Sequence, residues 1–92
     1  MQATAELQVI PVGQGVTVRN EIMQVIDVLS QYSLKTETHA SGTNLEGELK
    51  IILEAVAKVH EVLHDSGSVR LLSYLKLETR IDKQPTLAGK QL

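Results

Sequence analysis

The chain has 92 residues, of which 42% are hydrophobic and only 2% aromatic, and its formal net charge is −2 at pH 7. This length suits a single domain, residues 1–92, whose core must be built from Val, Leu and Ile. The acidic balance and the shortage of aromatic side chains argue against a nucleic-acid-binding surface, and the lack of cysteine excludes disulfides and thiolate chemistry.

Neither a secretion signal nor a membrane span is recognisable in the chain. The first residues show no basic region followed by an apolar run. No apolar stretch approaches the roughly 20 residues that a membrane-spanning helix needs. We therefore expect a cytoplasmic protein without membrane contact.

The first predicted element is a strand over residues 4–12. Leu7 and Val9 fall on one face of this strand, and the opposite face carries Gln8, Ile10 and Val12. Pro11 has no amide hydrogen, so it belongs near a strand end or on a side without a neighbouring strand.

A helix is expected next, over residues 18–31, with Thr17 as its N-cap. Its apolar residues recur at helical spacing and form a single stripe of Val18, Ile22, Val25, Ile26 and Leu29. A second strand follows over residues 34–40, in which Glu37 and His39 point away from the face that carries Leu34.

The second half of the chain predicts a turn with a short third strand, then a helix and a long strand. The helix covers residues 48–65, and its expected buried face consists of Leu49, Ile52, Leu53, Val56, Val59 and Leu63. Gly67 should end it in a left-handed conformation. The last strand covers residues 69–80, and the polar segment 81–92 is expected to cover a sheet edge or meet a neighbour.

The predicted order is strand, helix, strand, strand, helix, strand, which is typical of an α+β ferredoxin-like βαββαβ sandwich. In this fold two helices cover one face of a four-stranded antiparallel sheet. The helix-free face would then carry an apolar group among charged residues: Ile10, Val12, Leu72 and Tyr74. Such a face is a candidate for subunit pairing, for contact with another polypeptide or for a ligand cleft, although a solvated sheet surface is the simpler alternative.

The central stretch from Ser41 to Glu48 is the best candidate for a small-molecule site. Its two glycines allow close approach of another chain or a ligand. The hydroxyl of Thr43 and the carboxylate of Glu46 are the polar groups best placed to recognise such a ligand by hydrogen bonding. A purely structural turn is an equally good explanation of these residues.

One motif points to an enzyme instead. His60-Glu61-Val62-Leu63-His64 matches H-E-x-x-H, the pattern in which two helical histidines hold zinc and the glutamate is general base. Asp65, Glu78 or Asp82 could serve as a third zinc ligand, but the sequence spacing favours none of them over the others. A zinc hydrolase is therefore an alternative function. We expect instead that both histidines lie at the edge of the apolar stripe of an amphipathic helix and bind no catalytic metal.

Two further patterns have ordinary structural explanations. Gly13-Gln14-Gly15 resembles part of a phosphate-binding loop, but the rest of that motif does not follow, so a strand-to-helix turn is expected. The charged run of Arg80, Asp82 and Lys83 reads as a solvated strand end or as an intersubunit ion pair.

Taken in order, several stretches resemble the small thiamine-binding protein family of about 100 residues. The matching features span almost the whole chain: Ile10-Pro11-Val12-Gly13-x-Gly15, Leu34, Gly42-Thr43-x-Leu45-Glu46-Gly47-Glu48, His60-Glu61-x-Leu63, Gly67-x-x-Arg70, Lys76-Leu77-x-x-Arg80-x-Asp82-Lys83, Leu87 and Lys90. The resemblance also gives the His-Glu pair an explanation that involves no protease.

The resemblance implies a non-catalytic protein that binds thiamine or its hydroxymethylpyrimidine half and assembles through its sheets into dimers or tetramers. No cofactor, metal or nucleic-acid partner is expected. The predicted ligand-binding residues are Val12, Glu37, His39, Gly42, Thr43, Glu46 and Tyr74. Glu46 would accept hydrogen bonds from the aminopyrimidine, and Thr43 would donate one to a ring nitrogen.

Overall fold

The computed structural model describes residues 1–13 and 18–90. Its elements, in chain order, are β1 (Gln2–Val12), α1 (Arg19–Ser30), β2 (Lys35–His39), β3 (Gly42–Glu48), α2 (Leu49–Asp65), β4 (Arg70–Thr79) and the short 3-10 helix η1 (Ala88–Lys90). The predicted order is confirmed. The suggested N-cap Thr17 and most of the Gly13-Gln14-Gly15 turn lie outside the described residues.

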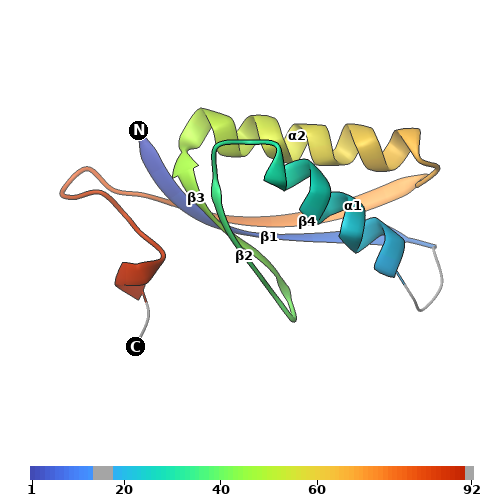
Figure 1. Cartoon of the computed structure of the whole chain (residues 1–92), viewed down its shortest axis with the longest axis horizontal. Coiled ribbons are helices and arrows are strands. Elements are labelled where there is room, and N and C mark those ends of the chain that lie inside the picture. Colours follow the sequence, from blue (N-terminus) through green and yellow to red (C-terminus); the bar gives the residue numbers. More distant parts are fainter. Residues whose placement is uncertain (14–17, 91–92) are drawn as a thin grey trace.

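The four strands form one antiparallel sheet in the order β2-β3-β1-β4. Both helices lie on the same face of this sheet, with α2 and α1 above the strands in Figure 1. The protein therefore has the predicted α+β ferredoxin-like fold. The opposite, helix-free face is crossed near one end by the C-terminal segment, residues 81–90.

Strand alternation distributes the side chains as predicted. Leu7 of β1 lies opposite Thr43 of β3 and Leu75 of β4, and the buried residues of β1 and β3 at these odd positions face the helices. Pro11 lies beyond the last β1–β3 pair, where only β4 adjoins β1. Its missing amide hydrogen therefore costs no hydrogen bond to β3.

The core is aliphatic and lies between the sheet and the two helices. Its most buried members are Ala3, Leu7, Leu29, Leu45, Ile52, Ala55, Val59 and Leu63. The expectation for α2 was wrong at one position: Leu53 is 46% exposed, while Ala55 is fully buried. Because Leu53 follows Ile52 directly, it points about 100° further round the helix, and the sheet reaches only one of the two.

α1 packs closely only in its C-terminal half. Val28 and Leu29 are buried, whereas Ile22, which belongs to the predicted apolar stripe, is 46% exposed. Val25 and Ile26 are half-buried. The first turns of α1 therefore hold apolar side chains over a space that the core does not fill.

The loop after α2 ends the helix as the sequence predicts. Gly67 has φ +111, and its amide donates to the carbonyl of His64. The amide of Ser68 donates to the carbonyl of Leu63. This positive-φ glycine after the helix satisfies its last carbonyls and turns the chain into β4.

The sequence suggested that the C-terminal segment covers a sheet edge or meets a neighbour, and the first of these alternatives is wrong. The segment turns back beneath the helix-free face, where Pro85 and Leu87 are buried (Figure 1). The Leu87 amide donates to Glu46 Oε1 of β3 at 2.7 Å, and Lys90 Nζ lies 2.6 Å from Glu78 Oε1 of β4. Apolar burial and these two polar contacts explain why a polar segment follows the sheet face.

Within the described residues, no helix has both the length and the apolar character required to cross a membrane.

Candidate functional site

Two hollows lie on opposite faces of the sheet. One, which we call the cleft, opens between α1 and the β2–β3 hairpin and has a volume of about 340 Å³. The other, which we call the tail cavity, lies on the helix-free face beside the C-terminal segment and measures about 590 Å³. They share no lining residue among those described.

The cleft has mostly apolar walls. α1 provides Ile22, Val25 and Ile26, and β1 provides the stretch from Leu7 to Pro11. The remaining described lining residues come from Val18 and from the hairpin, residues 38–43. None of these is Asp, Glu, Lys or Arg, so this space can accept an uncharged, flat group without desolvating a charge.

Thr43 sits in the wall of the cleft, facing the helices. Its side chain is largely buried, with 5% of the residue exposed, and its Oγ1 lies 3.4 Å from Oγ1 of the more exposed Thr38 on β2. This hydrogen bond is long, so both hydroxyls retain capacity for a stronger partner. The predicted residue Thr43 therefore presents a polar group inside an apolar space.

Gly42, at the start of β3, lets the hairpin close against β1. A Cβ at this position would lie 2.5 Å from the backbone oxygen of Leu7. Only glycine fits so near a neighbouring strand. Gly42 thus has a packing role, and it also lines the cleft.

His39, at the end of β2, lies at the rim of the cleft. Its Nδ1 accepts a hydrogen bond from the Ser41 amide at 3.2 Å, which places the ring proton on Nε2. Nε2 lies 3.1 Å from Asn44 Oδ1 and 3.3 Å from Glu6 Oε2. The imidazole is therefore held between the hairpin and β1.

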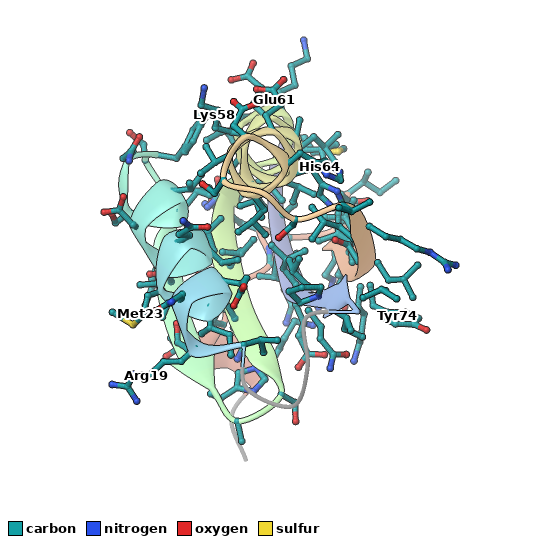
Figure 2. The ribbon with its side chains drawn as sticks, turned by 90° about the vertical axis from the view of Figure 1, so that its right-hand side faces the viewer. Arg19, Met23, Lys58, Glu61, His64 and Tyr74 are labelled. Carbon is teal, nitrogen blue, oxygen red and sulfur yellow. The ribbon has the colours of Figure 1, made fainter. Side chains whose placement is uncertain are left out.

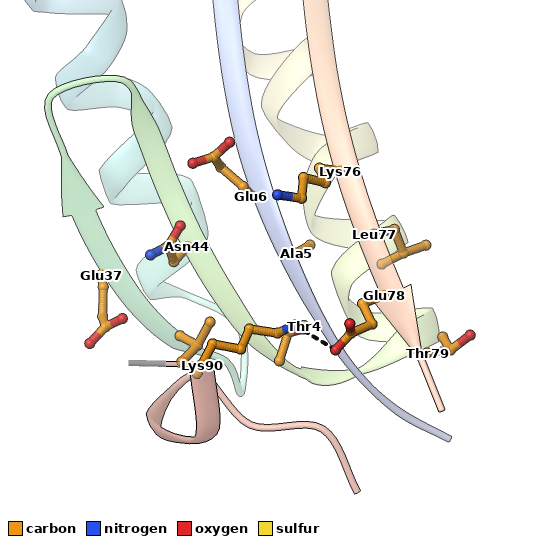
Figure 3. Close-up of a pocket in the computed structure, with 11 residues that line it drawn as sticks. Thr4, Ala5, Glu6, Glu37, Asn44, Lys76, Leu77, Glu78, Thr79 and Lys90 are labelled. Atoms are coloured by element: carbon orange, nitrogen blue, oxygen red, sulfur yellow. Dashed lines mark ion pairs between the residues drawn. The ribbon is translucent and has the colours of Figure 1, made fainter. Parts of the chain in front are cut away.

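The tail cavity has a different chemical character (Figure 3). Its polar lining includes three carboxylates and two ammonium groups: Glu6, Glu37, Glu78, Lys76 and Lys90. Lys90 pairs with Glu78, and this hydrogen-bonded contact lowers the pKa of the Glu78 carboxyl below its ordinary value. The predicted residue Glu37 belongs to this cavity and not to the cleft.

Glu46 and Thr43 lie on opposite faces of the sheet, whereas the sequence analysis expected both to contact one ligand. Residues three apart on a strand point to opposite faces, so the sheet separates the two side chains. Glu46 lies on the helix-free face, where its Oε1 accepts the Leu87 amide. Its observed role is to anchor the C-terminal segment.

Val12 and Tyr74 line neither hollow. Val12 is half-buried at the end of β1, opposite Arg70 of β4. Tyr74 is 63% exposed and points away from the sheet in Figure 2. Tyr74 therefore does not reach the cleft of its own chain.

The H-E-x-x-H histidines are engaged in contacts between α2 and the strand that follows it. His60 Nε2 hydrogen-bonds with Oγ of Ser73 on β4, and His64 Nδ1 donates to the carbonyl of Ser68. Glu61 lies 3.9 Å from Lys58, pointing to solvent (Figure 2). Among residues 1–13 and 18–90, no three His, Asp or Glu side chains gather at a metal-binding distance.

The charged run after β4 forms a local pair. Arg80 donates to both carboxylate oxygens of Asp82, and this contact lowers the pKa of Asp82 while raising that of Arg80.

Sequence reasoning missed the residues that complete the two hollows. Thr38 faces Thr43 across the β2–β3 pair, and Asn44 lies between Glu37 and Glu6 on the opposite face. Strand alternation combined with the hairpin register was the available signal. The sequence could not show that Ile22 and Ile26 stand over an open cleft, because an apolar stripe has the same spacing whether it packs against the core or borders a cleft.

Comparison with known proteins gives a consistent result. The model of the family described as "Thiamine-binding protein" matches residues 5–92. UPF0045 protein MJ1052 of Methanocaldococcus jannaschii is 41% identical over 90 residues, covering 97% of this chain and 88% of that protein. UPF0045 protein sll0230 of Synechocystis is 36% identical, covering 98% and 74% of the two chains.

Solved structures agree on the fold. The crystal structure of MJ1052 superposes with a TM-score of 0.91 at 38% identity, covering 97% of this chain and 91% of that one. A Thermotoga maritima protein provisionally assigned to thiamine biosynthesis or salvage has a TM-score of 0.86 at 22% identity, with 98% and 95% covered. This second likeness concerns the fold alone.

Proposed function

Because this chain belongs to the thiamine-binding protein family, we propose that it binds thiamine, or the hydroxymethylpyrimidine half of thiamine, in the cleft beneath α1. The observation that carries the proposal is the unfilled apolar overhang of α1 above the buried Thr43 hydroxyl. Binding occurs without catalysis and without a metal or cofactor.

The size and polarity of the cleft support a pyrimidine ring. Small-molecule pockets typically enclose about 300–1,000 Å³ with largely apolar walls and few polar groups. The cleft, at about 340 Å³, lies near the lower bound, which suits one substituted ring better than a large cofactor. Ile22 and Ile26 would cover the ring face that the sheet does not contact.

The hydroxyl pair supports recognition of the aminopyrimidine edge. That edge places an amino donor beside a ring-nitrogen acceptor, and each threonine hydroxyl can donate or accept. With their oxygens 3.4 Å apart, Thr38 and Thr43 can serve the two adjacent ring groups together. In this arrangement Thr43 keeps its predicted role, and Thr38 takes the place assigned to Glu46.

The charge distribution supports an orientation for the whole vitamin. A thiazolium cation inside an uncharged apolar cleft would lose its hydration without compensation. The neutral pyrimidine therefore enters the cleft, and the thiazolium remains outside it, at the mouth, where water can solvate its charge.

Calorimetry with hydroxymethylpyrimidine and thiamine tests this proposal. Thr43→Val removes the buried hydroxyl while keeping its shape, and we expect roughly tenfold weaker binding, about 1.4 kcal/mol. Thr38→Val should weaken binding to a smaller extent, because that residue is more exposed. Thr36→Val, on the same strand but outside the cleft, is the matched control.

Equal affinity for the wild type and Thr43→Val would contradict the site. Absence of measurable heat with either compound at millimolar concentration, for protein of intact fold, would contradict the function.

We also propose that two copies pair through the apolar strip of the helix-free face, formed by Ile10, Val12, Leu72 and Tyr74. This strip lies at the end of the face that the C-terminal segment leaves open; Leu72 is 43% and Tyr74 63% exposed. Self-complementary pairing about a two-fold axis is the commonest way for such a surface to be buried.

Sedimentation analysis tests the pairing. Leu72→Glu should convert a dimer or tetramer into smaller species, and Leu53→Glu, equally exposed but on α2, should leave the mass unchanged. A monomeric wild type at tens of micromolar would overturn self-pairing and leave another polypeptide as the occupant of the strip.

A further inference from the structure

The tail cavity is separate from the proposed thiamine site and has a built polar lining of its own. It lies on the other face of the sheet, between β1, β4 and the C-terminal segment, and its volume of about 590 Å³ is well within the range for small-molecule pockets. Its floor is the sheet itself, and Leu87 of the C-terminal segment forms part of one wall.

A row of four polar residues crosses the cavity floor, one from each strand. In spatial order they are Glu37 of β2, Asn44 of β3, Glu6 of β1 and Lys76 of β4, each directly opposite the next in the strand register (Figure 3). Neighbouring strands are about 4.8 Å apart. The row therefore presents two carboxylates flanking an amide at one end and an ammonium group at the other.

The charged residues at the two ends of this row make no close ion pair within the described part of the protein, although Lys76 acts on the Glu78 carboxylate at longer range. No ion pair within 4.0 Å joins Glu37 or Lys76 to another residue in the ranges 1–13 and 18–90. Glu6 contacts His39, and Glu78 is already paired with Lys90. Opposite charges a short distance apart, without contact between them, are suited to a ligand that carries both signs.

Thr4 supplies an independent indication. It lines the cavity, only 2% of the residue is exposed, and its hydroxyl makes no side-chain hydrogen bond with another described residue. No fully shielded side-chain polar atom of the described residues lacks a partner, which agrees with a hydroxyl that is accessible from the cavity. A nearly buried hydroxyl normally has a hydrogen-bonding partner, and here the cavity is where one would sit.

We propose that the tail cavity binds a small zwitterion, a molecule with an ammonium group and a carboxylate a few bonds apart. The ammonium lies between Glu37 and Glu6 over the Asn44 amide, and the carboxylate reaches Lys76 and the Thr4 hydroxyl. A bare metal ion fits this site less well, because no three acidic or histidine side chains of the described residues converge there. A simple anion would face three carboxylates.

A titration followed by ¹H–¹⁵N NMR on the full chain tests this site with three matched probes: 4-aminobutyrate, butylamine and butyrate. We expect saturable shifts for 4-aminobutyrate at Glu37, Asn44 and Lys76, and affinities at least about tenfold weaker for the two probes that carry one charge. Equal binding of butylamine and 4-aminobutyrate, or no saturable shift with any probe, would overturn the proposal.

Variants separate this site from the cleft. Glu37→Gln and Lys76→Met alter side chains on the surface, so the fold should persist, and each should weaken 4-aminobutyrate binding about tenfold. Thr43→Val, on the other face, should leave it unchanged. Loss of 4-aminobutyrate binding in Thr43→Val, or its retention in both cavity variants, would contradict an independent site.

Discussion

The cleft beneath α1 is uncharged and mostly apolar, whereas the tail cavity behind the same sheet is lined by five charged side chains. Both use the β2–β3 hairpin: Thr38 and Thr43 face the cleft, and Glu37 and Asn44 face the cavity. Adjacent residues of one short hairpin therefore serve two chemically different spaces. Strand alternation, and not proximity in sequence, therefore decides which residues can contact the same ligand.

The largest expected effect concerns the packed side of the sheet. Leu45 of β3 is fully buried against the helices, so Leu45→Ala should lower the free energy of unfolding by about 2–5 kcal/mol. The same change at the half-exposed Leu72, on the open side, should cost less than about 1 kcal/mol in dilute solution. Urea denaturation measures both, and equal losses would contradict the assignment of the core to one face.

The next effect concerns the closure of the cleft. Gly42→Ala places a methyl group against the Leu7 carbonyl, which must shift, and we expect a loss of about 1–3 kcal/mol in stability. Hydroxymethylpyrimidine binding should weaken in the same variant. Ser41→Ala, the preceding residue, is the control for the loss of stability only, because Ser41 also lines the cleft. A fully stable Gly42→Ala would mean that the hairpin does not approach β1 so closely.

A smaller effect separates the two faces directly. Glu46→Gln weakens the acceptor of the Leu87 amide, and we expect about 1 kcal/mol less protection of the C-terminal segment against amide exchange. Affinity for hydroxymethylpyrimidine should not change, since the sheet lies between Glu46 and the cleft. A parallel loss of that affinity would restore Glu46 as a ligand-binding residue.

The smallest effect is a pH dependence of the C-terminal segment. Lys90 holds the pKa of Glu78 below its ordinary value, so this contact stabilises the attached segment above that ordinary value and is lost as the pH falls through the lowered pKa. Carboxyl resonances followed by NMR should show the Glu78 midpoint rising in Lys90→Ala. An unchanged midpoint would mean that the contact is absent in solution.

Much of the fold could be predicted from sequence because local patterns specify it. The alternation of Leu7, Val9 and their neighbours predicted β1 and its faces, and the spacing of Ile52, Val59 and Leu63 predicted α2 and its buried side. Gly67 marked the end of α2 for a local steric reason. These features depend on a few adjacent residues and need no distant partner.

The candidate site was predicted less well. The sequence predicted Gly42, Thr43 and Glu46 as one ligand-binding group, but only Gly42 and Thr43 line the cleft, and Glu46 lies on the other face of the sheet. Its partner, the Leu87 amide, is 41 residues away in sequence, a contact that no local pattern announces.

The amino-acid pattern alone specifies the order of the elements, the two faces of each strand and membership of the thiamine-binding protein family. Two features depend on long-range contacts: the first turns of α1 stand over an open cleft, and the C-terminal segment folds back to form one side of a charged cavity. The spacing of apolar residues shows which side of a helix or strand is apolar. Whether that side packs against protein or borders an open cleft depends on the position of segments that are distant in sequence.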